Sequence, residues 1–305
     1  MNNLITDIKS LELETIKNLR NSKSANTLRA YQSDYNDFSL FCSKNGFQVM
    51  PTQPKILALY LTHLSSYSKY STLKRRLASI SILHKTKGHY IDTKHPIIME
   101  NLMGIKRTNG SNQKGKKPIL INDLKVLINA ILQSNEKNDR KIRDKALILV
   151  GFSGGFRRSE LVDIEYEDLD FVSEGVKIFV KRSKTDQSGE GMTKAIPYFD
   201  NEKFCPVNAL KSWIEIFDLK EGKIFDISDK SVALIIKKYA NYAGLDGHKY
   251  AGHSLRSGFA TSTAESGAEE RNIMAMTGHK STEMVRRYIK EANLFKNNAL
   301  NKIKI

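Results

Sequence analysis

The stretch GGFRRSEL, residues 154–161, gives the first indication of the fold. Two glycines precede a predicted helix, and Arg157 and Glu160 stand three residues apart on its first turn, where the carboxylate can orient the guanidinium. Alone, such a pair is most often a weak surface ion pair. The other interpretation is an arginine held in place for a chemical purpose, which has to be judged from the rest of the chain.

Two more polar motifs follow toward the C-terminus. HSLR puts His253 and Arg256 on one helix face, although a single His-x-x-Arg pattern indicates only a polar pair. GHK adds His279, and Tyr288 comes nine residues later, about two turns into a following helix. Tyr288 alone fits a packing aromatic, because most of the 12 tyrosines must pack or lie at the surface. It is the order of all these motifs together that chance rarely produces.

This ordered set resembles the tyrosine recombinases, the lambda-integrase-like family of site-specific DNA recombinases. That family has an arginine in a G-x-R-x-S-E-L helix start, matched here by GFRRSEL with Arg157 rather than Arg158 in register, followed by HSLR, GHK and a tyrosine. It also has a lysine on a β-hairpin, matched best by Lys184 in KRSKTDQSG. The resemblance covers residues 119–290 and implies an enzyme that breaks and rejoins DNA strands. Other cations on the same predicted hairpin are Lys181, Arg182 and Lys194.

A phosphodiester target accounts for these residue types occurring together. Attack at phosphorus builds negative charge on the non-bridging oxygens, which bidentate contacts from Arg157 and Arg256 can neutralise. His279 can add a hydrogen bond to the same phosphate. The resemblance implies that these three residues bind the scissile phosphate.

The same resemblance makes Tyr288 the nucleophile. A phenol ionises near pH 10 in water, so it needs a base or a cationic pocket at neutral pH, and His253 is the expected partner. Lys184 is the expected general acid for the leaving 5′ oxygen. The product would be a 3′-phosphotyrosine and a free 5′ hydroxyl. Because the covalent link keeps the bond energy, no ATP or other cofactor is expected.

No metal site is expected either. EYEDLD, residues 165–170, is an isolated acidic run without partners of the two-metal type, and we expect a solvated helix end there. Cys42 and Cys205 form no CxxC pattern and show no metal-type spacing to a histidine. Two buried thiols are the simpler expectation.

The N-terminal part is predicted to be a helical bundle. Ser24 is a plausible cap for a helix that ends at Gly46, and two more helices follow through KILALYLTHLSSY and STLKRRLASISILHKTKG. A polar, cationic segment, KRTNGSNQKGKK, then indicates a linker. Further along, two helices precede GVKIFVKRSKTDQSGEGMTKAIPY, where β-branched runs on either side of Gly189 and Gly191 predict a hairpin.

The expected fold class is therefore mainly α with a small β-hairpin (α+β). We expect a helical DNA-binding bundle at residues 1–105, a basic linker at 106–118, and a tyrosine-recombinase-type catalytic domain with a C-terminal tail at 119–305. The tail can dock on a neighbouring subunit or pack on its own domain.

The charge of the chain points to a polyanionic partner. The 305 residues carry a net charge of +16. Residues 1–117 hold 19 Lys and Arg against 7 Asp and Glu, a net charge of +12, whereas residues 118–305 hold 30 against 26, a net charge of +4. Double-stranded DNA is the expected partner. The expected phosphate contacts are Lys74, Arg75, Arg76, Lys116 and Lys117.

The resemblance also implies an assembly and a location. Strand exchange between two duplexes implies a tetramer on paired DNA sites, with accessory DNA-bending proteins as further partners. No apolar run is long enough to span a bilayer, and the N-terminus shows no signal-peptide pattern, so we expect a cytoplasmic, nucleoid-associated protein without a membrane partner. Two alternatives stay open: a type IB topoisomerase-like nicking-closing enzyme, and a non-catalytic DNA-binding regulator.

Overall fold

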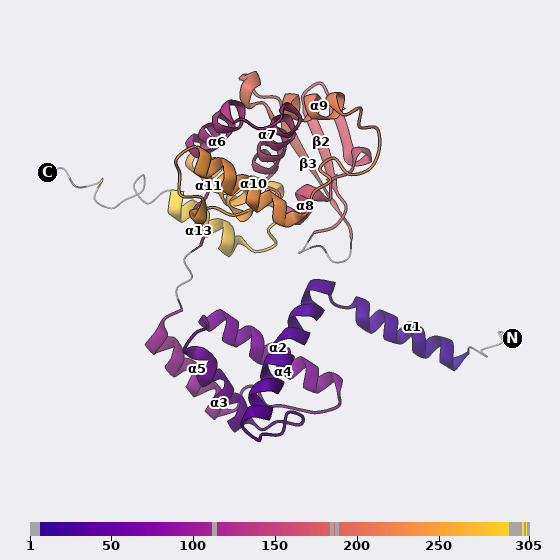
Figure 1. Ribbon diagram of the computed structural model, residues 1–305, viewed down its shortest axis with the longest axis vertical. Helices are drawn as coiled ribbons and strands as arrows, with labels where there is room; N and C mark the ends of the chain where they lie inside the picture. Colours follow the sequence, from indigo (N-terminus) through magenta and orange to yellow (C-terminus); the bar gives the residue numbers. More distant parts are fainter. Residues whose placement is uncertain are drawn as a thin grey trace. The chain divides into compact units, whose positions relative to one another are not determined.

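The chain forms two compact units, Met1–Lys114 and Gly115–Ile305 (Figure 1). The computed structural model describes residues 7–111, 115–183, 186, 189–292, 301 and 303. Helices dominate both units, and a single small antiparallel sheet is described, in the second unit. The predicted fold class is thereby confirmed.

The first unit is built from helices whose ends follow local sequence signals. Ser24 caps α2, its side chain accepting a hydrogen bond from the backbone N–H of Thr27, as predicted. Proline at the first position starts both α3 and α5. The helices are α1 (Ile8–Asn21), α2 (Ala25–Lys44), α3 (Pro54–Ser65), α4 (Tyr70–Thr86) and α5 (Pro96–Asn109).

Apolar residues at helical spacing give this unit its own core. The side chains of α2, α3, α4 and α5 that face inward are almost completely buried. Phe38 and Tyr60 pack edge to face, with ring centroids 5.1 Å apart. The core also contains Cys42, Leu57, Leu61, Leu64, Leu73, Leu77, Ile80, Ile91, Ile98 and Leu102.

Helix α5 extends into the segment that was expected to be a linker. Helix α5 continues through Asn109, so the first four residues of the expected linker, Lys106 to Asn109, are helical. Asn109 donates its side-chain amide to the backbone carbonyl of Ser65 at the end of α3, a contact that supports the extra turn. The helix stops at Gly110, whose φ of 72° is accessible mainly to glycine.

The second unit contains the sheet, with the strands in the order β1-β2-β3. The predicted hairpin is present as β2 (Gly175–Val180) and β3 (Met192–Pro197). A third strand, β1 (Leu169–Val172), pairs with the other side of β2. The prediction of a solvated helix end at residues 165–170 was wrong, because this run forms a short turn and enters β1, and Asp168 is buried.

Helices cover the sheet and surround one buried helix. Helix α7 is buried along its C-terminal half, and in the view of Figure 1 it lies between the sheet with α9 on one side and the remaining large helices on the other. The helices are α6 (Ile121–Gln133), α7 (Asn138–Ser153), α8 (Arg158–Val162), α9 (Pro206–Ile216), α10 (Asp229–Tyr242), α11 (His253–Glu265), α12 (Glu270–Thr277) and α13 (Thr282–Ala292).

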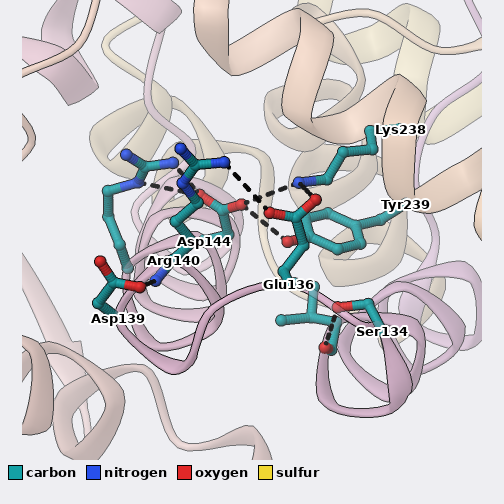
Figure 2. Close-up of polar contacts among 9 residues, drawn as sticks. Ser134, Glu136, Asp139, Arg140, Asp144, Lys238 and Tyr239 are labelled. Atoms are coloured by element: carbon teal, nitrogen blue, oxygen red, sulfur yellow. Dashed lines mark hydrogen bonds and ion pairs between the residues drawn. The ribbon is translucent and has the colours of Figure 1, made fainter.

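A polar network anchors the N-terminal half of α7 to α10 (Figure 2). The buried carboxylate of Asp144 accepts hydrogen bonds from the hydroxyl of Tyr239, at 2.8 Å, and from the guanidinium of Arg143, at 2.8 and 3.0 Å. Lys238 binds Glu136 at 3.1 Å and adds a further positive charge near Asp144. A buried carboxylate with this many donors fixes the helix in position. The opposite end of α7 leads directly into residues 154–157, the loop that precedes α8.

Other features of the sequence can be located in the described part of the chain. Cys42 and Cys205 are both buried free thiols, as predicted. In the described ranges, no three His, Cys, Asp or Glu side chains lie close enough together to hold a metal ion. None of the described helices is both long and apolar enough to span a bilayer.

Candidate active site

The loop between α7 and α8 places the first arginine. Arg157 is the N-cap of α8, and its backbone N–H donates to a carboxylate oxygen of Glu160 at 3.0 Å. Its guanidinium donates to the other oxygen of Glu160 at 2.5 Å. Burial alone would raise the pKa of Glu160, but Lys194 and Arg157 outweigh it and hold the pKa below its ordinary value. The pair is thus a nearly buried structural unit and not a surface ion pair.

Helix α11 brings the second arginine to the same loop. Arg256 is buried, and its guanidinium donates to the backbone carbonyl of Gly155 at 2.9 Å. A second N–H of the guanidinium points to Nε2 of His279, 3.1 Å away. Burial, with the nearby charge of Arg157, lowers the pKa of Arg256 to about 10, so the guanidinium remains charged at neutral pH. Both arginines are therefore held against backbone or side-chain acceptors before any ligand arrives.

His279 follows the left-handed Gly278 that ends α12. The hydroxyl of Thr277 donates to the carbonyl of Ile273 at 2.6 Å and lies 2.7 Å from Nδ1 of His279. Because a guanidinium can only donate, Nε2 must accept from Arg256, and the proton of the neutral ring then belongs on Nδ1. Burial and the charge of Arg256 lower the pKa of His279 to about 4, which agrees with this neutral form.

Tyr288 lies on α13, at the edge of a small apolar cluster formed with α11 and α12. Its ring is half-buried, with its centroid 6.3 Å from that of His279. The neighbouring Val285 is completely buried, and Arg286 binds Glu270 of α12 through two contacts of 3.2 Å. These contacts hold α13 against α12, with the Tyr288 ring beside His279 and near enough to Arg256 for their charges to interact.

The two remaining residues of the expected catalytic set are His253 and Lys184. His253 is the first residue of α11, one turn before Arg256, and its side chain is exposed. Lys184 lies outside the described residues. The structure therefore brings together Arg157, Arg256, His279 and Tyr288, with His253 on the same helix as Arg256.

The other cations near these residues have separate environments. Arg158 points to Asp229 of α10, 3.7 Å away, so Arg157 is the arginine that lies with Glu160. Lys181 binds Glu165 and Asp168, and these hydrogen bonds raise its pKa above the ordinary value. A lysine so strongly paired is a poor proton donor.

Lys194 was predicted to lie on the hairpin, but its place in the sequence did not indicate a role. It lies on β3 directly opposite Ile178, and its side chain is fully buried against the loop at residues 154–157, where its ammonium donates to the carbonyl of Gly154. A signal was present in the sequence: in the alternating strand MTKAIP, Lys194 takes the same face as the buried Ile196. A lysine on the inward face of a strand is unusual enough to be noted.

The three expected DNA contacts on α4 differ in how much of each side chain is exposed. Lys74 is exposed. Arg75 binds the buried Asp34, although its side chain remains 47% exposed. Arg76 is only 17% exposed and binds Asp37 of α2 and the hydroxyl of Tyr60 of α3, so it ties α4 to both helices. The cluster looked uniform in sequence because the acidic partners lie on a different helix.

Lys116 and Lys117 lie at the start of the second unit. Lys116 donates to the backbone carbonyl of His248 at 2.7 Å. Lys117 binds Asp123 at 3.0 Å and the hydroxyl of Tyr250 at 3.1 Å, and its side chain is 46% exposed. Both cations remain at the surface while they bind the first residues of the second unit to the segment around His248 and Tyr250.

Comparison with known proteins identifies the family. Residues 125–294 match the model of the phage integrase family, which is more than half of the chain. An integrase/recombinase XerD homolog from Selenomonas ruminantium is 42% identical over 98% of this chain and 91% of that protein. A tyrosine recombinase XerC from Syntrophus aciditrophicus is 26% identical over 91% of each.

Solved structures share the fold. The XerH site-specific recombinase bound to a palindromic difH substrate matches with a TM-score of 0.65 and 18% identity, over 86% of this chain and 77% of that one. A lambda integrase dimer bound to a COC′ core site matches with a TM-score of 0.59 and 19% identity, over 96% and 98% of the two chains. With the family model and the 42% identical relative, the conclusion is that this chain belongs to the phage integrase family of tyrosine recombinases, enzymes that cleave and rejoin DNA at specific sites.

Proposed function

We propose that the hydroxyl of Tyr288 attacks a DNA phosphodiester that is bound by Arg157 and Arg256. The observation that carries the proposal is the convergence of both guanidinium groups on one loop, beside the His279 ring that faces Tyr288. Such an arrangement of donors, positioned in advance, is what stabilises the charge that develops at a phosphorus under attack.

Charge supports an anionic substrate at this position. The two guanidinium groups and Lys194 face a single described carboxylate, that of Glu160, while His279 is neutral. The cluster therefore has an excess of positive charge that a phosphodiester can neutralise. To bind there, a phosphate oxygen takes over the N–H that Arg256 now gives to His279. The added negative charge favours protonation of His279, which can then donate to the same phosphate.

The chemical step conserves bonds and protons. The phenol oxygen of Tyr288 bonds to phosphorus while the bond from phosphorus to the 5′ oxygen breaks, which leaves a 3′-phosphotyrosine and a 5′ hydroxyl. In the proposal, His253 accepts the phenol proton and Lys184 supplies the proton that the leaving oxygen needs. A 5′ hydroxyl from a second duplex reverses the step and completes strand exchange.

The proposal extends to DNA binding and assembly. Lys74 and Arg75 of the first unit, with Lys116 and Lys117 of the second, are the exposed cations proposed to contact the DNA backbone. The XerH and lambda integrase structures are complexes with DNA, which supports a duplex partner. We further propose a tetramer on paired sites, aided by DNA-bending proteins, acting on nucleoid DNA in the cytoplasm.

The test is capture of the covalent intermediate. Bound sequences are first selected from random duplexes by the purified protein, and a nicked duplex of the selected sequence is then used as a suicide substrate. We expect an adduct that survives detergent, disappears after protease treatment, and leaves a 5′ hydroxyl that can be labelled with a kinase. Tyr288→Phe should abolish the adduct because it removes the attacking oxygen.

A matched tyrosine in the same unit provides the control. Tyr242 is exposed on α10, and Tyr242→Phe should leave the adduct yield unchanged. An adduct of undiminished yield in Tyr288→Phe would refute the assignment of the nucleophile. Relaxation of supercoiled DNA without any product joining two sites would instead indicate a nicking-closing activity.

A further inference from the structure

A fully buried lysine lies beneath the candidate active site. Lys194 on β3 exposes none of its side chain, whereas lysine is almost never fully buried without a partner. Its ammonium donates to the backbone carbonyl of Gly154 at 2.8 Å and lies 3.8 Å from a carboxylate oxygen of Glu160. It also lies 4.3 Å from the centroid of the Phe156 ring, within range of a cation–π contact.

The groups that hold Lys194 are those that position the two arginines. Gly154 and Phe156 belong to the loop that ends at Arg157, and Glu160 is the acceptor for the guanidinium of Arg157. The carbonyl next to that of Gly154, on Gly155, is the acceptor for Arg256. One ammonium therefore holds a carboxylate and a loop on which both phosphate-binding side chains depend.

The loop has little freedom to replace this support. Gly155 adopts a left-handed conformation with φ of 55°, and a Cβ there would lie 2.9 Å from the ring of Phe259. The carbonyl of Gly154 points into the protein, so loss of the ammonium would leave it without its donor in a buried place. We expect such a loop to shift when its donor is removed.

The protonation state of Lys194 depends on the charged and titratable groups packed around it. The groups that face it are Glu160 on α8, Arg157 before α8, Arg256 on α11 and His279 after α12. Burial lowers the pKa of Lys194 to about 7, with Glu160 opposing this effect and the two arginines adding to it. Near neutral pH the amine therefore exists in both forms, and a bound phosphate anion favours the charged one.

We propose that Lys194 is a positioning residue for strand cleavage, and that its ammonium form holds Glu160 and the Gly154 carbonyl so that Arg157 and Arg256 meet the scissile phosphate. The inference rests on the proposed function, in which these arginines bind that phosphate. In this proposal Lys194 does not contact the substrate, because its side chain is completely buried and its ammonium donates to the carbonyl of Gly154. It is thus separate from the general acid, the role proposed for Lys184.

The experiment measures single-turnover cleavage of the suicide duplex at saturating protein, from pH 6 to 9.5. Lys194→Met keeps the length of the side chain and removes the charge. We expect it to slow cleavage about 100-fold, as small misplacements of catalytic groups do, while the Kd for the duplex changes less than about threefold. The wild-type rate should fall as the amine loses its proton, and this fall should be absent in Lys194→Arg, which stays charged.

Two controls separate positioning from other roles. Lys177 on β2 is a surface lysine bound to Asp170, and Lys177→Met should cleave at the wild-type rate. A duplex with sulfur in place of the leaving 5′ oxygen needs no general acid, since a thiolate leaves without a proton. Lys194→Met should remain slow on this duplex, whereas recovery of the wild-type rate would overturn positioning in favour of proton donation.

The outcomes are distinguishable from failure of the proposed function. If Tyr288→Phe abolishes the adduct but Lys194→Met cleaves within about threefold of wild type, the proposed function stands and this inference is refuted. Identical pH profiles for wild type and Lys194→Arg would also refute it. If Lys194→Met does not fold, judged by its circular dichroism spectrum, the Lys194→Arg profile still decides.

Discussion

Burial of an amine makes the stability of the second unit depend on pH in a calculable way. Lys194 has an ordinary lysine pKa in the unfolded chain and a pKa of about 7 in the folded one. Between these values the unfolded chain binds a proton that the folded chain does not, so stability rises with pH across this window. Below about pH 7 both states are protonated, and the full cost of burying the charge is present.

The magnitude follows from the separation of the two pKa values. With pKa values of 10.5 and about 7, the free energy of unfolding should increase by roughly 3 kcal/mol between pH 7 and pH 9.5 from this residue alone. Lys194→Met lacks the titrating group. The difference between wild type and Lys194→Met should therefore move in favour of wild type by that amount, and the contributions of other groups largely cancel in the comparison.

The single tryptophan makes the assay specific to the second unit. Trp213 is buried in α9, and its indole N–H donates to the carbonyl of Ile224 at 2.8 Å, so its fluorescence reports unfolding of that unit. Urea unfolding of the full chain at several pH values gives the free energies. If the two proteins differ by a constant amount, within about 0.5 kcal/mol, from pH 7 to 9.5, the inferred burial of a titrating amine is incorrect.

Three further predictions concern other positions. Gly258→Ala would place a Cβ 1.9 Å from the backbone oxygen of Ile119, and we expect a loss of about 3 kcal/mol, measured by tryptophan fluorescence in urea. Asp34→Asn removes the charge of the buried carboxylate beside Arg76, and we expect the first unit to lose about 3 kcal/mol, measured by hydrogen exchange of its helices. Burial and the charge of Arg256 lower the pKa of His279 to about 4, so protonating it opposes folding. Stability should therefore fall as pH drops from 6.5 toward 4, by roughly 2 kcal/mol once the shift is discounted for the partial solvent exposure of the ring, and His279→Gln should abolish that dependence in the same urea assay.

Each of these outcomes has a clear contrary result. Gly104 is a helical glycine of α5 with open space around it, so Gly104→Ala should raise stability by up to about 1 kcal/mol. A similar gain in Gly258→Ala would contradict the close approach to Ile119. Unchanged exchange rates in Asp34→Asn would show that the carboxylate is not needed for the helical packing. An acid limb that persists in His279→Gln would assign it to a different group.

Local signals in the sequence determined most of the elements. The cap at Ser24, the prolines at the starts of α3 and α5, and the helical spacing of apolar residues all act within a few residues of where they occur. The hairpin was predictable for the same reason, from alternation on either side of the turn that contains Gly189 and Gly191. The order of GFRRSEL, HSLR, GHK and the tyrosine was sufficient to indicate the family.

The structure was needed where partners come from distant parts of the chain. The sequence alone could not show that Arg76 is bound by Asp37 and Tyr60, or that the buried Asp168 has Lys181 beside it. Helix α5 runs into the segment expected to be a linker, and Asn109 in its last turn donates to the carbonyl of Ser65. None of these contacts can be predicted from the residues that flank either partner in the sequence.

At the candidate active site, Lys194 shows the same difference between what local sequence determines and what distant contacts decide. The sequence by itself determined that a lysine stands on the inward face of β3, and that an arginine and a glutamate share the start of α8. Only the tertiary structure decided that these groups meet, because packing brings a strand against a loop forty residues earlier in the chain. The charge, burial and hydrogen bonds of that ammonium are properties of the assembled unit, since each depends on atoms that no local segment contains.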